Sequence, residues 1–138
     1  VVAFEPESVH YECLVKNVGE DIETHQLAIG AEEKMISLSQ DDFTQSKRVL
    51  GEGTIPMVTI DSLQLDDVDM IKIDVEGYEM EVLKGATNTL ENVQYLMIEL
   101  NNNTKKYGSS NIKIEKHISS LGFKVLMNHW PDKVFYRP

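Results

Sequence analysis

Short apolar runs alternate with amphipathic stretches in the first part of the chain. Residues 1–4 (Val-Val-Ala-Phe) are all apolar, which is typical of a strand buried in a parallel sheet. From residue 6 to about residue 18 apolar side chains recur at helical spacing, so we expect an amphipathic helix packed on the sheet. Residues 23–29 predict a second strand, which Gly30 closes.

An insertion is expected between this second strand and the next crossover. Residues 34–38 and 49–63 contain two apolar segments, the second interrupted by Gly51, Gly53 and Pro56. This pattern predicts an antiparallel pair of strands. Gly51 and Gly53 lack the third, helix-opening glycine of a dinucleotide-binding loop, so we interpret them as part of a turn.

The later part of the chain repeats the alternation of strand and helix. Residues 70–73 (Met-Ile-Lys-Ile) form the clearest predicted strand, and they lead directly into Asp74-Val75-Glu76-Gly77. A helix is expected after Gly77, with an apolar face that extends to Leu90. The remaining segments predict a strand, a polar loop, a helix and two final strands, at residues 93–100, 101–110, 112–121, 123–127 and 134–136.

This order of elements predicts an α/β fold built on an open sheet. Strands that alternate with helices imply right-handed crossovers and a mostly parallel sheet. The last two strands are joined by a short turn at Pro131, so the C-terminal edge is expected to be antiparallel. Ligands of such sheets bind beyond the carboxyl ends of the strands, and functional residues are therefore sought at that edge.

Composition and charge narrow the classes of protein. The 138 residues suit one domain or most of one, and the net charge of −10 argues against nucleic acid or an anionic membrane as a partner. The lone Cys13 permits no intrachain disulfide and fits a reducing compartment such as the cytoplasm; we expect it to be a small core residue. The sequence starts without Met inside a predicted strand, so we interpret it as N-terminally truncated.

Acidic residues follow three of the predicted strands. Glu5 can accept hydrogen bonds from the two hydroxyls of a ribose, or it can simply be a charge favoured at a helix N-terminus. Asp74 and Glu76 can converge on a cation or a polar substrate, or one of them can cap the next helix. Glu99 ends the neighbouring strand. Clustered carboxylates repel one another, so one of them is expected to keep its proton to higher pH, as a general base requires.

Other reactive side chains carry less information. The four histidines show no spacing typical of a metal site, so we expect them on the surface or in packing roles, and we assign no metal ligands. Trp130 lies beside His129 in the C-terminal turn, where a structural role is favoured over a place in a substrate pocket. No nucleophile motif of the G-x-S-x-G type is present.

Several of these segments together resemble one family. Residues 1–6 (Val-Val-Ala-Phe-Glu-Pro), 59–63 (Thr-Ile-Asp-Ser-Leu) and 97–99 (Met-Ile-Glu) are similar to segments of FkbM-type methyltransferases. Residues 71–79 (Ile-Lys-Ile-Asp-Val-Glu-Gly-Tyr-Glu) with 82–86 (Val-Leu-Lys-Gly-Ala) resemble the long signature of that family, which is its most specific part. The resemblance covers nearly the whole chain.

The resemblance implies a Rossmann-like class I fold and methyl transfer from S-adenosylmethionine to an oxygen of a small molecule or sugar. It implies that Glu5, with the adjacent Pro6, binds the ribose of the cofactor, and that Ala28 and Ile29 border its adenine. Asp74 and Glu76 are then expected beside the methyl donor or the acceptor, with Glu99 as their neighbour in catalysis. Where an acid often follows the adenine-side strand the chain has Gly30-Ala31, which puts a contact to the adenine amino group in doubt.

The first strand and the glycine-rich loop of that family precede the segment with which this sequence starts. Without them the sheet would have a gap in its middle, so we expect the chain alone to fold poorly and to bind S-adenosylmethionine weakly. Two alternatives stay open: a nucleotide-sugar transferase that holds a divalent metal with Asp74 and Glu76, and a domain without catalytic activity.

Overall fold

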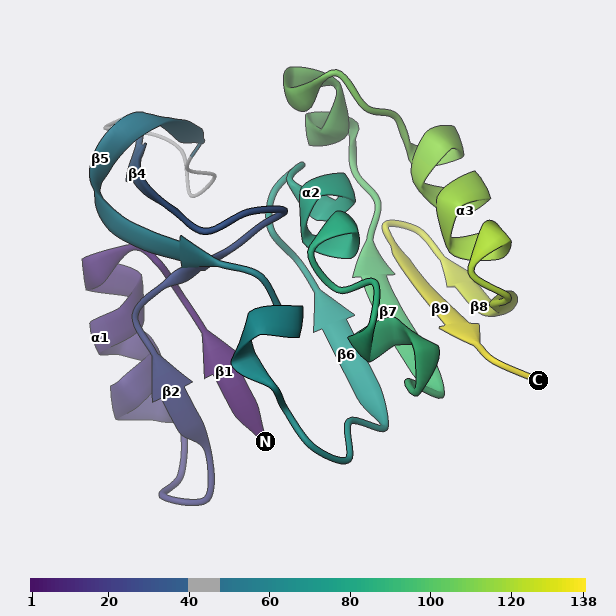
Figure 1. Cartoon of the computed structure of the whole chain (residues 1–138), viewed down its shortest axis with the longest axis horizontal. Coiled ribbons are helices and arrows are strands. Elements are labelled where there is room, and N and C mark those ends of the chain that lie inside the picture. The colour runs from purple at the N-terminus through teal and green to yellow at the C-terminus, as the bar shows by residue number, and fades with distance from the viewer. Residues whose placement is uncertain (40–47) are drawn as a thin grey trace.

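The computed structural model describes residues 1–39 and 48–138, which form three β-sheets accompanied by α-helices (Figure 1). The first sheet is a β-α-β unit made of β1 (Val2–Phe4), α1 (Ser8–Asn17) and β2 (Glu23–His25), in which the two strands are parallel. The first strand is confirmed. The helix begins at Ser8, two residues later than predicted, because the Glu7 side chain caps it by accepting a hydrogen bond from the His10 N–H.

The predicted strand at residues 23–29 is divided between two sheets. After β2 the chain turns, and β3 (Ala28–Ile29) pairs with β5 (Val49–Val58) instead of continuing beside β1. β5 also pairs in antiparallel fashion with β4 (Lys34–Leu38), which confirms the inserted antiparallel pair. The prediction of a single strand is wrong because residues 28–30 pair with β5 and not with β1. The Gly30 N–H, for example, donates to the carbonyl of Val58, which is distant in the sequence.

Gly51 and Gly53 do not form a turn between strands. Both lie within β5, where the ladder passes from Ile36 opposite Ile55 to Ser37 opposite Leu50 and leaves residues 51–54 without partners. A Cβ atom on Gly53 would lie 2.2 Å from the carbonyl oxygen of Ile36. The glycine therefore permits a bulge that bends this strand.

The largest sheet contains the strands of the later part of the chain, in the order β6-β7-β9-β8. β6 (Met70–Ile73) and β7 (Tyr95–Glu99) are parallel, whereas β9 (Asp132–Tyr136) is antiparallel to β7 and to β8 (Lys124–His129). The antiparallel C-terminal edge is thus confirmed. Among the described residues three strand pairs are parallel and three are antiparallel, so the fold is less parallel than predicted.

The helix after β6 is shorter than its apolar pattern predicts. α2 (Glu79–Lys84) ends at Gly85, and Leu90 lies instead in the separate 3-10 helix η2 (Thr89–Glu91). In a continuous helix the Thr89 N–H would bond to the Gly85 carbonyl. Here that carbonyl accepts from the Asp61 N–H, and the Asp61 carboxylate takes the Thr89 N–H. Asp61, which begins the 3-10 helix η1 (Asp61–Leu63), therefore ends the helix.

The segment predicted as a polar loop also contains a helix. Residues Asn102–Tyr107 form the 3-10 helix η3, and the Asn101 side chain caps it by accepting a hydrogen bond from the Asn103 N–H. The prediction missed this helix because its residues are almost all polar. The next helix, α3 (Asn111–Ser120), is confirmed, and Gly122 follows it with a φ of +92°.

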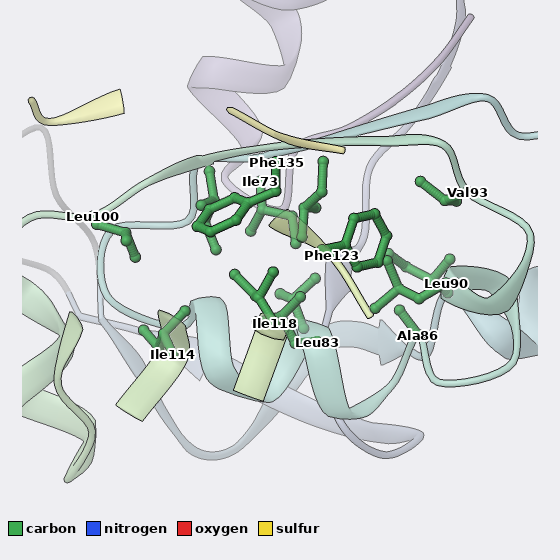
Figure 2. Packing of buried hydrophobic residues seen from close by; sticks show 14 residues of the cluster. Ile73, Leu83, Ala86, Leu90, Val93, Leu100, Ile114, Ile118, Phe123 and Phe135 are labelled. Carbon is green, nitrogen blue, oxygen red and sulfur yellow. The ribbon is translucent and has the colours of Figure 1, made fainter. Parts of the chain in front are cut away.

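The main hydrophobic core lies between the largest sheet and the helices α2 and α3 (Figure 2). Figure 2 labels its principal side chains: Ile73, Leu83, Ala86, Leu90, Val93, Leu100, Ile114, Ile118, Phe123 and Phe135. A second, smaller cluster consists of Ala28, Ile36 and Met57. By contrast α1 buries none of its residues, so Cys13 is exposed and the prediction of a core cysteine is wrong.

Candidate functional site

Three strands present their carboxyl ends at the same side of the molecule. Figure 1 shows β1 and β6 running in the same direction, and β7 is parallel to β6. Glu5 directly follows β1, Asp74 follows β6, and Glu99 is the last residue of β7. The strand directions agree with the expectation that these acids leave their strands on one side, but β1 belongs to a different sheet from β6 and β7.

Asp74, Glu76 and Glu99 form a group that we call the acid rim. The Asn101 amide connects two of its members, because its Nδ2 donates to Oε1 of Glu99 at 3.2 Å and to Oε2 of Glu76 at 3.4 Å. Asp74 accepts instead from Lys72, whose Nζ lies 3.0 Å from Oδ2. Glu76 and Glu99 are thus linked across β6 and β7, although they are 23 residues apart in the sequence.

A second asparagine strengthens this link. The Asn103 Nδ2 donates to Oε2 of Glu76 at 2.8 Å, and the Asn103 N–H donates to Oδ1 of Asn101 at 2.8 Å. Neither asparagine is predicted from the sequence, because both lie in a polar stretch whose composition indicates a loop. Their position directly after the strand that ends in Glu99 is the signal that would have identified them.

Glu99 has the perturbed acidity that the sequence analysis expects of one rim carboxylate. Burial contributes most to raising its pKa, and the neighbouring negative charges of Asp74 and Glu76 raise it further. The hydrogen bond from the Asn101 amide opposes this effect without cancelling it. A carboxylate with a raised pKa is a stronger base, which suits it to accept a proton from a hydroxyl group.

The backbone after β6 turns sharply, and this turn places the Glu76 side chain against Asn101 and Asn103. Glu76 has a φ of +54° and Gly77 a φ of +109°, values at which side chains are disfavoured. A Cβ atom on Gly77 would lie 2.6 Å from the carbonyl carbon and oxygen of Asn103, so only glycine fits. Neither Asp74 nor Glu76 caps α2, whose N-cap Tyr78 makes no side-chain capping bond.

Glu5 lies next to residues that line a cavity beyond the carboxyl end of β1. Its Oε1 accepts the Glu7 N–H at 2.8 Å, which fixes the turn that leads into α1. A cavity of about 690 Å³ is lined by Pro6, Glu7 and Ser8, by Gln26 after β2, and by residues of β4 and β5 and the residue after β4, namely Ser37, Leu38, Ser39, Thr54, Ile55 and Pro56. Hydroxyl and amide groups predominate among its polar side chains, so the cavity suits a ligand with several hydrogen-bonding groups.

Ala28 and Ile29 do not belong to the lining of this cavity. Ala28 is 4 % exposed and packs in the small core with Ile36 and Met57, while Ile29 packs against the main core. Gln26 is the residue from this stretch that faces the cavity. The structure therefore places Pro6 in the lining of the cavity, whereas Ala28 and Ile29 do not line it.

The remaining side chains with reactive groups lie elsewhere. Two of the four histidines pair locally with acids, His10 with Glu7 and His25 with Glu23. Trp130 is 74 % exposed, so it contributes little packing, contrary to the structural role that the sequence analysis favoured. Over residues 1–39 and 48–138, no group of three or more His, Cys, Asp or Glu side chains is arranged to hold a metal ion.

No helix in the described part of the chain combines the length and hydrophobicity needed to cross a lipid bilayer.

The fold and the site together define a mixed α/β domain with polar side chains gathered beyond the carboxyl ends of its parallel strands. Residues 1–125 match the family model of the methyltransferase FkbM domain. The chain therefore belongs to the FkbM methyltransferase family, and the resemblance seen in the sequence is confirmed.

The chain is also similar in sequence to one characterised methyltransferase and in fold to one solved structure. The chain is 37 % identical over 59 residues to the hexuronic acid methyltransferase AglP of Haloferax volcanii, an alignment that covers 38 % of this chain and 25 % of AglP. Its fold is similar to the crystal structure of an FkbM methyltransferase from Methylobacillus flagellatus KT, with a TM-score of 0.67 and 19 % identity. That match covers 99 % of this chain and 36 % of the other, so the chain spans little more than a third of the solved relative.

Proposed function

We propose that this chain is part of a methyltransferase domain that transfers a methyl group from S-adenosylmethionine to a hydroxyl group of a small molecule or sugar. The observation that carries the proposal is the acid rim, in which Asn101 joins Glu99 to Glu76 at the carboxyl ends of β6 and β7. Family membership supports methyl transfer. The hexuronic acid in the name of AglP supports a sugar as the acceptor.

For the fold, we propose a Rossmann-like class I sheet that includes one further strand. β1 pairs only with β2, and β6 pairs only with β7, within the described ladders. Both strands run in the same direction in Figure 1, and each leaves one edge without a partner. A parallel strand placed between them, followed by a glycine-rich loop, would satisfy both edges and unite the two sheets. On this proposal residues 1–138 are the C-terminal part of a single domain.

The residues near Glu5 suit the cofactor. Oε1 of Glu5 is engaged by the Glu7 N–H, which leaves Oε2 to accept hydrogen bonds from a ribose diol. Pro6 and Gln26 both line the adjoining cavity, so both are placed to contact the nucleoside. Ala28 and Ile29 are predicted to border the adenine, although Gln26 is the residue from this stretch that lines the cavity.

Bound there, S-adenosylmethionine would supply an electrophilic methyl group. The negative charge of Asp74 and its neighbours on the rim favours binding of a positively charged sulfonium ion. Glu99 would accept the proton of the acceptor hydroxyl, because burial raises its pKa and so makes it a better base. Glu76, held by Asn101 and Asn103, would orient the hydroxyl by a hydrogen bond.

The test is to replace each rim carboxylate by its amide and measure methyl transfer and cofactor affinity separately. With labelled S-adenosylmethionine and a panel of sugars that includes hexuronic acids, Glu99→Gln should lower turnover by about 100-fold or more. Its cofactor affinity should change by less than about threefold, since Glu99 is not placed to bind the nucleoside. Glu91→Gln, an exposed acid on η2, is the matched control. Unchanged turnover in all three rim variants would remove the rim from the mechanism.

A further inference from the structure

Glu79 is a buried acid that the proposed reaction does not use. It is the first residue of α2, its exposed fraction is 0 %, and its Oε1 accepts the Gly77 N–H at 2.8 Å. Its Oε2 has no hydrogen-bond partner among the described residues. Burying a carboxyl group with half of its hydrogen-bonding capacity unused is costly, so its presence needs an explanation beyond packing.

The bond to Gly77 lies where the backbone after β6 is most constrained. Glu76 and Gly77 both have positive φ, and the strained conformation of Glu76 needs support from its surroundings. Gly77 is also pressed against the backbone of Asn103. The Glu79 carboxyl thus holds the turn from inside the protein, while Asn103 holds it from the side of η3.

We propose that Glu79 is a positioning residue for the acid rim. By accepting the Gly77 N–H it keeps Glu76 in its left-handed conformation and so keeps the Glu76 carboxylate against Asn101 and Asn103. Its importance for catalysis rests on the proposed function, but its effect on the turn does not. Glu79 itself is enclosed and does not touch the substrate.

The electrostatic surroundings of Glu79 agree with a hydrogen-bonding role for its neutral form. Burial is the main cause that raises its pKa, and the negative charges of Glu76 and Asp74 add to it, against the lowering effect of the Gly77 N–H and of its own N–H. Burial raises the pKa of the Tyr107 hydroxyl on η3, and the charge of Glu79 adds to this effect. A neutral carboxyl still accepts the Gly77 N–H through its carbonyl oxygen, and so does a glutamine side chain.

Hydrogen exchange of the Gly77 amide in the full chain, measured by NMR, tests the proposal. Glu79→Leu keeps a side chain of comparable bulk without an acceptor, and it should speed exchange at Gly77 by about tenfold, the effect of losing one hydrogen bond. It should also shift the Asn103 side-chain amide signals. Glu79→Gln should restore both properties to wild-type values. Glu81→Gln, on the same helix but paired with Lys84 near the surface, is the matched control and should leave Gly77 unchanged.

Two results would overturn the proposal. The first is Gly77 exchange and Asn103 amide signals in Glu79→Leu that match the wild type. The second is a loss of Gly77 protection in Glu79→Gln as large as in Glu79→Leu. If Glu79→Leu unfolds, as circular dichroism would reveal, Glu79→Gln alone decides, and Gly77 exchange about tenfold faster than in the wild type would overturn the proposal. None of these measurements requires methyl transfer. Their outcome is therefore independent of the result of the Glu99→Gln assay, which tests the proposed function.

Discussion

Asp61 and Thr89 are 28 positions apart, yet the Asp61 Oδ1 accepts two hydrogen bonds from Thr89, one from its N–H and one from its hydroxyl, both at 2.8 Å. The other oxygen, Oδ2, accepts the Asn88 N–H at 3.0 Å. The Asp61 carboxylate thus holds the start of η2 against the segment after β5, while the Asp61 N–H binds the Gly85 carbonyl at the end of α2. We expect the carboxylate to be among the most important polar side chains for stability.

Replacing Asp61 by alanine should lower the free energy of unfolding by about 2 kcal/mol at pH 7. Three hydrogen bonds to a charged group are lost, and two of their donors are backbone N–H groups at a helix terminus. Chemical denaturation measures the change. Asp66→Ala, an exposed acid in the same segment, should change stability by less than about 0.5 kcal/mol. Equal losses in the two variants would contradict the role assigned to Asp61.

The contribution of Asp61 should depend on pH. Partial burial by itself would raise the pKa of Asp61, but the hydrogen bonds from Asn88 and Thr89 outweigh it and lower the pKa below 3.8. A carboxylate whose pKa is lower in the folded state stabilises the fold above its ordinary pKa and loses that effect as pH falls. The difference in stability between wild type and Asp61→Ala should therefore shrink below pH 3.8, as denaturation at a series of pH values would reveal.

Two glycines with positive φ should differ in their tolerance of alanine. Gly77→Ala combines an unfavourable φ with a Cβ atom 2.6 Å from the backbone of Asn103, so it should destabilise the chain by about 2 kcal/mol or more. Gly108→Ala has a φ of +71° but open space around its Cβ, and its cost should be near 1 kcal/mol. Chemical denaturation of both variants measures the two losses of stability. A larger loss in Gly108→Ala than in Gly77→Ala would show that the turn at Gly77 adapts to a side chain at little cost.

Arg137 should resist conservative replacement. Its guanidinium donates to the carbonyls of Leu90 at 2.6 Å and Leu121 at 2.8 Å, and it lies 4.5 Å from the centre of the Phe123 ring. Lysine keeps the charge but cannot bond two divergent carbonyls in one plane, so Arg137→Lys should cost about 2 kcal/mol in thermal unfolding. Lys106→Ala, at an exposed position of η3, should cost less than about 0.5 kcal/mol.

The chain alone should bind S-adenosylmethionine weakly. Glu5 and the acid rim lie on two sheets that no strand pairing joins in the described residues, so the two parts of the proposed site are not held rigidly together. Isothermal titration should give a dissociation constant well above the low micromolar range. A low micromolar value would show that the gap between β1 and β6 does not impair the site.

Local pattern was enough to locate several of the strands and one of the helices. β1, β6, β7 and α3 were all predicted, because each has a run or a periodic stripe of apolar residues. The parallel pairing of β6 and β7, whose carboxyl ends carry the acid rim, was predicted as well, since strands linked by a helix in one sheet are normally parallel. The extended helix at residues 79–90 was wrong because its end depends on Asp61, a contact that no short window of sequence contains.

The polar part of the site was harder to anticipate. Asn101 and Asn103 were overlooked because asparagines usually indicate loops, and here the loop is a 3-10 helix whose side chains face the acid rim. Glu79 was overlooked because an acid in the first turn of a helix normally points to solvent. Its carboxyl group instead folds back onto the Gly77 N–H, beside the positive φ of Glu76 and Gly77, a turn that the sequence shows only as a single glycine.

The shallow packing of α1 has a consequence for how the chain opens. Because this helix buries no side chain, little apolar contact opposes its detachment, and the unit of β1, α1 and β2 should unfold locally long before the main core does. A protease added under native conditions should therefore cut first within this unit. Since Glu5 belongs to it, any nucleoside that binds there would have to order the unit, and its affinity would be reduced by that cost.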